Sequence, residues 1–133
     1  MLAACAAGGL DGFPRDEILV SGQPWLVAIA DDATRRAQGL MGVEDLGALR
    51  GVLFVFPEDT TSGFWMKDTP LALDIAFFAA DGSPVGLLSM APCPGEDCPV
   101  YRPAGPYRYA LEVPAGGFSG LAGLRLDPAS VGD

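Results

Sequence analysis

LDIAFFAADGSPVGLLSM, residues 73–90, is the stretch that predicts the fold most directly. Its first part, from Leu73 to Ala79, has the length and the apolar content of a buried strand. Asp81-Gly82 follows, and both residues tolerate the positive φ angles of a tight hairpin turn. Val85 to Met90 has the composition of a returning strand. The sequence therefore predicts an antiparallel hairpin here.

Further strands and a short helix are predicted on both sides of this hairpin. Asp31 or Asp32 is suited to cap a helix that runs to about Gln38, and Gly39 suits its end. Other apolar or alternating runs of strand length lie between turn residues. We expect strands at residues 25–30, 52–56 and 107–113, with Pro57 ending the second of these, and a further strand that begins at residues 64–66. We also expect one or two helical turns at residues 116–121, and we place Leu124 and Leu126 at the edge of the sheet.

Six or so short strands with little helix predict a mainly β fold. We expect a single compact β-sandwich or barrel-like domain with one or two short helices. We place this β-rich domain at residues 17–133. Residues 1–16 are interpreted as an N-terminal tail, a possible remnant of a lipoprotein signal and linker.

Charge and composition exclude several classes of function. The chain carries 17 acidic and 8 basic residues, a net charge of −9. Nucleic acid is therefore not an expected partner, because sequence-independent binding needs a basic face. The chain has no histidine, which removes the serine-histidine catalytic sites and the usual histidine-rich metal sites. We expect neither a metal ion nor another cofactor.

The cysteines indicate an oxidising compartment. Cys93 and Cys98 flank the turn-forming tetrapeptide Pro94-Gly95-Glu96-Asp97, which favours a structural disulfide over a redox-active pair. Leu2-Ala3-Ala4-Cys5 is similar to the lipobox of bacterial lipoproteins, although the upstream parts of a signal peptide are missing. The match is either the end of such a signal or chance in an alanine-rich tail. We expect a periplasmic or cell-envelope protein whose contact with the membrane is a possible lipid anchor at Cys5.

Five ordered motifs within residues 35–127 give the chain a family resemblance. It resembles the domain-of-unknown-function 192 family, small bacterial and archaeal proteins that often follow a signal peptide. The resemblance implies a single β-rich domain and no established activity. The motifs are R-x-x-G-L-M at Arg36–Met41, G-x-L-F-x-F at Gly51–Phe56, F-W-M-K-N-T at Phe64–Thr69 with Leu73-Asp74, the pair Cys93 and Cys98, and Y-x-L-E-V at Tyr109–Val113 with Ala115-Gly116.

The chain departs from this family pattern at three positions. Asp68 stands where the family usually has Asn, Val43 where it often has Arg, and Pro114 where it frequently has Asn. An aspartate accepts hydrogen bonds but does not donate them when ionised. The first two departures make the local charge more negative, so they put a polar network common to the family in doubt or retune it.

The candidate ligand-binding residues centre on Trp65 and Lys67. Lys67 is the only lysine in the chain. If residues 64–67 are extended, Trp65 and Lys67 share a face and form a platform for a polar ligand. Alternatively, Trp65 belongs to the core and Lys67 pairs with a carboxylate. The full candidate set is Trp65, Lys67, Asp68, Asp74, Tyr101 and Glu112, with Arg36, Met41 and Met66 in support.

Asp74 and Glu112 each lie inside an otherwise apolar strand. A buried and unpaired carboxylate costs several kcal/mol. Each of the two therefore faces solvent, pairs with Arg36 or Lys67, or belongs to a site. Two carboxylates and a lysine are also a possible acid–base set for hydrolysing a glycan.

These observations support three hypotheses of function. The first is an extracytoplasmic, non-catalytic binding or accessory module whose partner is a small polar ligand or a cell-envelope component. The second is a histidine-free hydrolase that acts on an envelope glycan through Asp74, Glu112 and Lys67. The third is a structural protein-interaction module, which an exposed contiguous apolar patch would favour.

Overall fold

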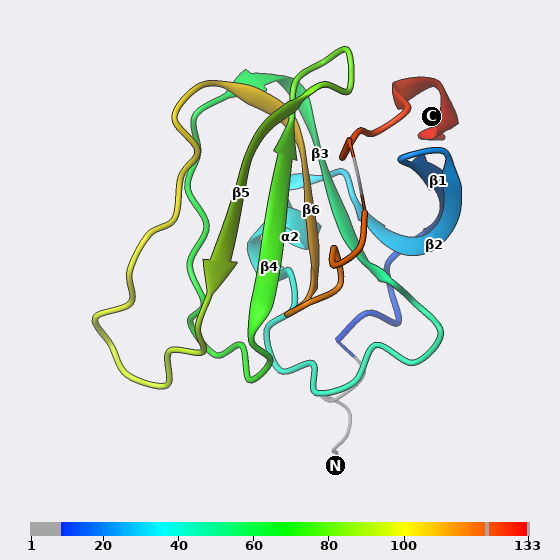
Figure 1. The fold of residues 1–133 in the computed structure, drawn as a ribbon. Coiled ribbons are helices and arrows are strands. Elements are labelled where there is room, and N and C mark those ends of the chain that lie inside the picture. The colour runs from blue at the N-terminus through cyan, green and yellow to red at the C-terminus, as the bar shows by residue number, and fades with distance from the viewer. Residues whose placement is uncertain (1–8, 122, 133) are drawn as a thin grey trace.

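Six strands form one mixed sheet in the computed structural model, which describes residues 9–121 and 123–132 (Figure 1). The order across the sheet is β1-β2-β3-β6-β4-β5; β2 and β3 are parallel, and all other neighbours are antiparallel. The mainly β class is confirmed, but the described sheet is open rather than a closed barrel. The strands are β1 Arg15–Val20, β2 Gln23–Ala30, β3 Gly51–Thr60, β4 Leu73–Phe78, β5 Pro84–Met90 and β6 Tyr107–Pro114.

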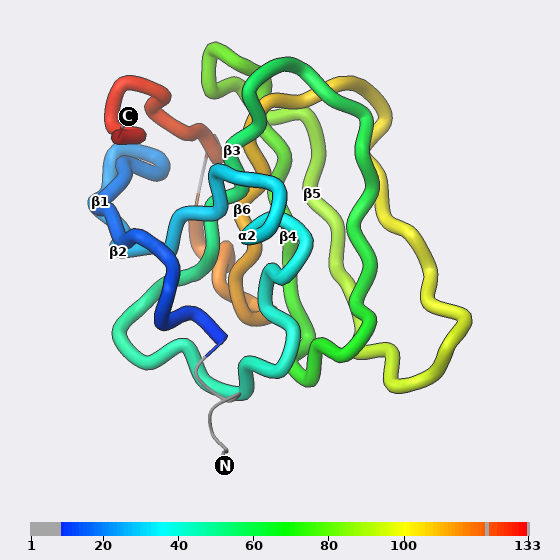
Figure 2. The backbone as a smooth tube through the Cα atoms, turned by 180° about the vertical axis from the view of Figure 1, so that it is seen from behind, coloured from blue at the N-terminus to red at the C-terminus, as the bar shows by residue number. Residues whose placement is uncertain are grey.

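The predicted helix is present as α2, Ala33–Gln38, in the connection from β2 to β3. The Asp32 carboxylate caps it by accepting a hydrogen bond from the backbone N–H of Arg35, 2.8 Å away. Gly39 ends the helix with φ of 48°, a left-handed conformation that glycine adopts without steric cost. The helix lies behind the sheet in Figure 1 and in front of it in Figure 2, so it covers one face.

Apolar side chains pack on both faces of the sheet. The first cluster lies on the face that α2 covers and contains Ala28, Val52, Phe54, Ile75, Phe77, Ala110, Leu40 and Met66, among others. The second cluster lies on the opposite face and contains Ile18, Trp25, Val27, Leu53, Ala76, Phe78, Leu111, Val113, Phe118 and Leu126, among others. Alternate residues of β3, β4 and β6 supply the two clusters, as the period of a strand requires.

The predicted hairpin is confirmed as β4 and β5. Its turn contains Gly82 at φ of 87°, and a Cβ there would meet the backbone carbonyl oxygen of Leu126. Leu126 also forms a bridge with Val20 of β1. The segment that ends in the 3-10 helix η1, Pro128–Ser130, therefore lies beside the β1–β2 hairpin, as Figure 1 shows. This agrees with the predicted edge position of Leu126.

The structure corrects three details of the sequence interpretation. Strand β1 is not among the strands expected from the sequence; its first half is charged, yet it pairs along its whole length with β2. Pro57 lies inside β3 rather than at its end. The register between β3 and β6 shifts between Val55 and Thr60, and at such an irregularity the missing backbone N–H of a proline leaves no inter-strand hydrogen bond unmade. Residues 64–66 do not begin a strand; Phe64 forms only an isolated bridge with Tyr101.

Residues that precede position 17 also contact the rest of the fold. Leu10 and Phe13 are buried in the first cluster, and β1 starts at Arg15. A backbone hydrogen bond from Phe13 to Leu10 closes a turn between them. The predicted lipidation site, Cys5, lies outside the described residues.

Candidate functional site

A cavity of about 260 Å³ lies on the face of the sheet that α2 covers. One wall is the end of α2 and the turn after it, from Arg36 to Met41. The aromatic side chains of Phe54 and Phe56, two residues apart on β3, form another wall. Segment 62–65 and Thr69 complete the rim, and Glu112 of β6 lies at the sheet side. The cavity therefore joins segments that are distant in the sequence.

Glu112 is the most unusual residue of the cavity. Its cross-strand neighbours are Val52 and Ile75, which both belong to the first cluster, so its side chain shares their face. The residue is only 4% exposed. No hydrogen bond or ion pair between described residues involves its carboxyl group. Burial alone raises the pKa of Glu112 to about 8, because the charged form has lost its hydration.

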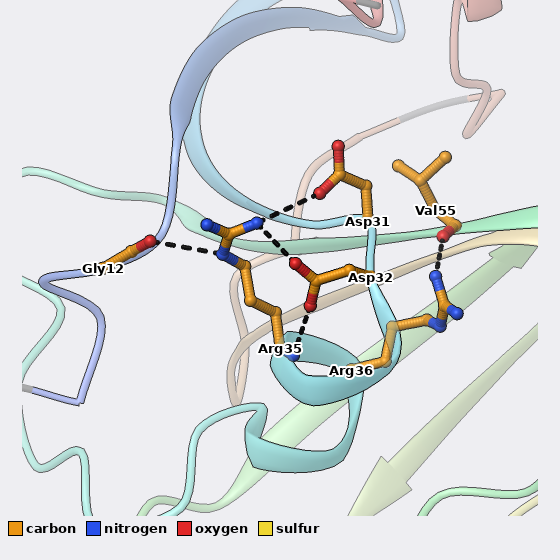
Figure 3. A network of polar contacts seen from close by, with 6 residues as sticks. All are labelled: Gly12, Asp31, Asp32, Arg35, Arg36 and Val55. Carbon is orange, nitrogen blue, oxygen red and sulfur yellow. Dashed lines mark hydrogen bonds and ion pairs between the residues drawn. The ribbon is translucent and has the colours of Figure 1, made fainter.

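Arg36 is the other charged residue that lines the cavity. Its Nη1 donates a hydrogen bond to the backbone carbonyl oxygen of Val55 at 2.8 Å, as Figure 3 shows. Its guanidinium also lies over the ring of Phe56, 5.0 Å from the centroid. These two contacts hold the guanidinium in place without neutralising its charge. The neighbouring Arg35 differs, because it forms ion pairs with Asp31 and Asp32 (Figure 3).

Aromatic rings surround much of the remaining cavity surface. Phe64 packs edge-to-face against Phe54, with centroids 5.0 Å apart. Trp65 is 48% exposed and stands at the rim. Tyr107 packs against these aromatic residues, because its ring contacts Phe64 and Phe56. Its hydroxyl donates a hydrogen bond to the backbone carbonyl oxygen of Ser62. Burial raises the pKa of Tyr107, so its hydroxyl stays protonated and keeps this bond.

Four of the predicted site residues meet in this cavity. Trp65 and Glu112 come from the candidate ligand-binding set, and Arg36 and Met41 come from the supporting set. They reach the cavity from different elements: the helix and its turn, segment 62–65, and β6. Their roles in binding stay predictions, but the structure places the four around one space.

The other predicted residues lie elsewhere. Lys67 is half-buried and bridges to Cys93 through the backbone, and Met66 is buried in the first cluster. Tyr101 pairs with Phe64 by two backbone hydrogen bonds, and its hydroxyl accepts one from the N–H of Ala91. Asp68 borders a separate hollow that also touches Cys93. Lys67 therefore does not line the cavity that Trp65 borders, and a joint role of the two residues in binding stays a prediction.

The backbone conformation at position 68 explains why an aspartate is suited to it. Its φ is 56°, in the left-handed region, and its carbonyl oxygen accepts a hydrogen bond from Gly42 at 2.8 Å. Asparagine and aspartate enter this region more easily than most other residues. The family resemblance puts Asn at this position, and either side chain meets this backbone requirement.

The hydrolase hypothesis required Asp74, Glu112 and Lys67 to converge, and they do not. Asp74 lies between Leu73 and Ile75, which point to the first cluster, so its side chain is on the opposite face from Glu112. It accepts a hydrogen bond from the backbone N–H of Gly116 at 2.9 Å. Lys67 does not line the cavity of Glu112. The three residues therefore form no common acid–base site.

The predicted disulfide between Cys93 and Cys98 is present, with Cα atoms 5.7 Å apart. Within the described ranges, no three histidine, cysteine or acidic residues lie together as a metal site would need. Over the same ranges, the structure contains no helix with the length and apolar character needed to cross a membrane.

Several cavity residues were not expected from the sequence. Phe54 and Phe56 were assigned to a strand, and Gln38 and Gly39 to the end of a helix, without a role in a site. Alternation along β3 does put Phe54 and Phe56 on one face. The sequence does not reveal which segments cover that face. That depends on how segments 36–41 and 62–69 fold back over the sheet.

Comparison with known proteins identifies relatives but no activity. The sequence profile of DUF192, described as an uncharacterised ACR, matches residues 17–124. No curated protein matches the chain. A Sinorhizobium meliloti 1021 structure, described as a candidate transcription regulator, is similar with a TM-score of 0.77 and 30% identity over 90% of this chain and 97% of that one. The structure of a Novosphingobium aromaticivorans DSM 12444 protein of unknown function is also similar, with a TM-score of 0.75 and 25% identity. The match covers 89% of this chain and 88% of that one.

Proposed function

Because this chain belongs to the DUF192 family of uncharacterised proteins, we propose a function from the cavity itself. The domain binds a small polar ligand there without catalysing a reaction. The volume of about 260 Å³ suits a small metabolite or a single sugar-sized fragment better than a polymer. The aromatic walls and the two charged residues supply both apolar contact and orientation.

The observation that carries this proposal is the carboxyl group of Glu112, which is nearly buried, has no hydrogen-bond partner among the described residues and borders the cavity. A polar group of this kind costs free energy unless it is hydrogen-bonded. No described residue offers that hydrogen bond, whereas the cavity gives a ligand access to the group. A bound ligand that donates a hydrogen bond to this carboxyl group would remove the free-energy cost of leaving it unpartnered. The removal of that cost would contribute to the binding free energy.

The alternative functions have less support in the structure. The hydrolase lacks its second carboxylate, because Asp74 lies on the other face of the sheet. For an interaction module, the large exposed apolar side chains in the described residues are Trp65, Leu87 and Val100. Trp65 stands at the rim of the cavity, so its exposure is also explained by ligand binding.

A thermal-shift panel tests the binding proposal. Amino acids, amines, sugars, nucleotides and envelope fragments are added to the wild type, Glu112→Gln and Asp74→Asn. A ligand at about 100 times its Kd stabilises a protein by about 2.7 kcal/mol. We expect at least one compound to raise the Tm of the wild type and of Asp74→Asn, and to do so less for Glu112→Gln. Asp74→Asn is the matched control, because it neutralises a carboxyl group on the opposite face. A panel without any shift contradicts the proposal.

We further propose that the protein works in an extracytoplasmic compartment. The Cys93–Cys98 disulfide supports this, since disulfides persist mainly in oxidising compartments. Trapping free thiols with a maleimide in intact cells provides the test. We expect Cys93 and Cys98 to be unlabelled until a reductant is added. Labelling of both cysteines without reductant would place the protein in a reducing compartment.

A further inference from the structure

The geometry points to a small zwitterion as the ligand, with its ammonium group against Glu112 and its carboxylate against Arg36; free amino acids are the simplest ligands of this class. This inference rests on the proposed binding function and specifies its ligand class. It follows from three features of the cavity: a buried acid, aromatic walls, and a cation held apart from the acid.

The acidic end selects a positive group. Glu112 is 4% exposed and has no partner among the described residues. Phe54, Phe56, Phe64 and Trp65 line the same cavity. Aromatic faces attract cations, and the attraction grows when both groups are removed from water. A carboxylate beside aromatic rings therefore recognises an ammonium group better than a neutral hydroxyl group.

The basic end selects a negative group. Among the described residues that line the cavity, Arg36 is the only cation and Glu112 the only anion. No ion pair within 4.0 Å joins them, since the ion pairs of the described residues involve only Arg35 and Arg108 as cations. Arg36 uses Nη1 to bond Val55 and keeps other N–H groups of its planar fork for a carboxylate. A ligand with two opposite charges satisfies both residues.

Binding should also move a proton. Burial holds the pKa of free Glu112 at about 8, so the group is mostly protonated near neutral pH. An ammonium ligand pairs only with the carboxylate form, and its positive charge lowers that pKa. The carboxyl proton then passes to the buffer while the ligand keeps its own protons. Arg36 is the charged group that shares the cavity, and it stays protonated throughout.

The experiment is isothermal titration calorimetry with matched triplets of ligands. Each proteinogenic amino acid is compared with its decarboxylated amine and its deaminated acid, in two buffers of different ionisation enthalpy at about pH 7. We expect at least one amino acid to bind about tenfold or more tightly than both of its analogues. Its binding should release close to one proton per ligand from the wild type.

Three variants assign the two ends of the site. Glu112→Gln should weaken binding and release no proton. Arg36→Gln should bind the amino acid no more tightly than the amine. Arg108→Gln is the control, because its ion pair with Asp59 lies outside the cavity, and it should behave as the wild type. Circular dichroism and Tm confirm that each variant is folded before its affinity is compared.

The other outcomes separate this inference from the binding proposal. If a sugar or another neutral compound binds in a Glu112-dependent way without proton release, the cavity is a binding site but the zwitterion inference is wrong. Equal affinity for the amine and the amino acid would overturn the role of Arg36. If no compound from the triplets or the wider panel binds, both the inference and the proposed function fail.

Discussion

The carboxyl group of Glu112 should make folding stability depend on pH. Its folded-state pKa of about 8 lies above its ordinary value of 4.5, so the folded protein holds this proton more tightly than the unfolded chain. The stabilisation is complete below the unfolded value and is lost as the pH rises through the folded value. We expect the free energy of unfolding to fall by about 1.4 kcal/mol per pH unit, on the order of 4 kcal/mol between about pH 5 and pH 8.

Urea unfolding at several pH values measures this effect. The chain has no histidine, so no histidine titration overlaps the window. Glu112→Gln removes the titrating group, and its stability should stay nearly constant there, exceeding that of the wild type at the upper end. Parallel curves for the two proteins would show that Glu112 ionises normally, and would remove the electrostatic argument for the cavity.

The residue at position 68 is predicted to matter through its backbone rather than its charge. At φ of 56°, an alanine side chain is strained by about 1 kcal/mol, whereas asparagine and glycine tolerate the conformation. We therefore expect Asp68→Ala to lower the free energy of unfolding by about 1 kcal/mol, and Asp68→Asn to change it little. Urea unfolding of both variants, with Asp68→Gly as the control, measures the difference. An equal loss in Asp68→Ala and Asp68→Asn would mean that the carboxylate itself stabilises the fold.

At the scale of elements, the disulfide loop braces one wall of the cavity. Cys93 forms a bridge with Lys67, and Tyr101 forms one with Phe64, so the loop after β5 holds the segment that carries Trp65. Closing a loop of this size contributes about 2 kcal/mol through the entropy of the unfolded chain. We expect Cys93→Ser/Cys98→Ser to lose about that much stability in urea unfolding. Reductant should destabilise the wild type similarly and leave the double variant unchanged; no change in either case would mean that the loop folds separately from the rest.

The elements differ in how well their sequence predicts them. The β4–β5 hairpin and α2 were predicted because their signals are local: Gly82 at the turn, Asp32 at the cap and Gly39 at the end. Strand β1 was missed because its pairing with β2 compensates for its charged first half. The 64–66 segment was assigned to a strand because its apolar residues resemble one, but Met66 faces the core while Trp65 faces the cavity rim. Its shape depends on contacts with Tyr101 and Cys93, which lie far along the chain.

The candidate site was predictable as a set of residues but not as an arrangement. Glu112 was singled out because a carboxylate in an apolar strand requires an explanation. Asp74 satisfied the same criterion, yet it lies on the other face with a backbone partner. The alternation of β4 and β6 alone does not reveal this difference, because it depends on the register between the two strands.

At the scale of the whole molecule, charge argues against a role on nucleic acid, although one structural relative is described as a candidate transcription regulator. The chain has 8 basic residues against 17 acidic ones, and Arg35 and Arg108 are already paired with carboxylates. Non-specific DNA binding depends on several unpaired cations that neutralise phosphates, with Kd of about 10⁻⁴ to 10⁻⁶ M at physiological salt. A molecule with a net charge of −9 should instead be repelled by the duplex.

We therefore expect no saturable binding of a fluorescent DNA duplex in an anisotropy titration, even at about 50 mM salt, where electrostatic attraction is strong. The same titration with Asp31→Asn/Asp32→Asn, which frees Arg35 from both of its carboxylate partners, provides the matched control. Weak binding by that variant alone would show that paired carboxylates suppress DNA contact. Salt-sensitive binding by the wild type with a Kd below about 10⁻⁵ M would show a basic surface on the folded protein that its total charge conceals, and would favour the role described for the Sinorhizobium protein over ligand binding alone.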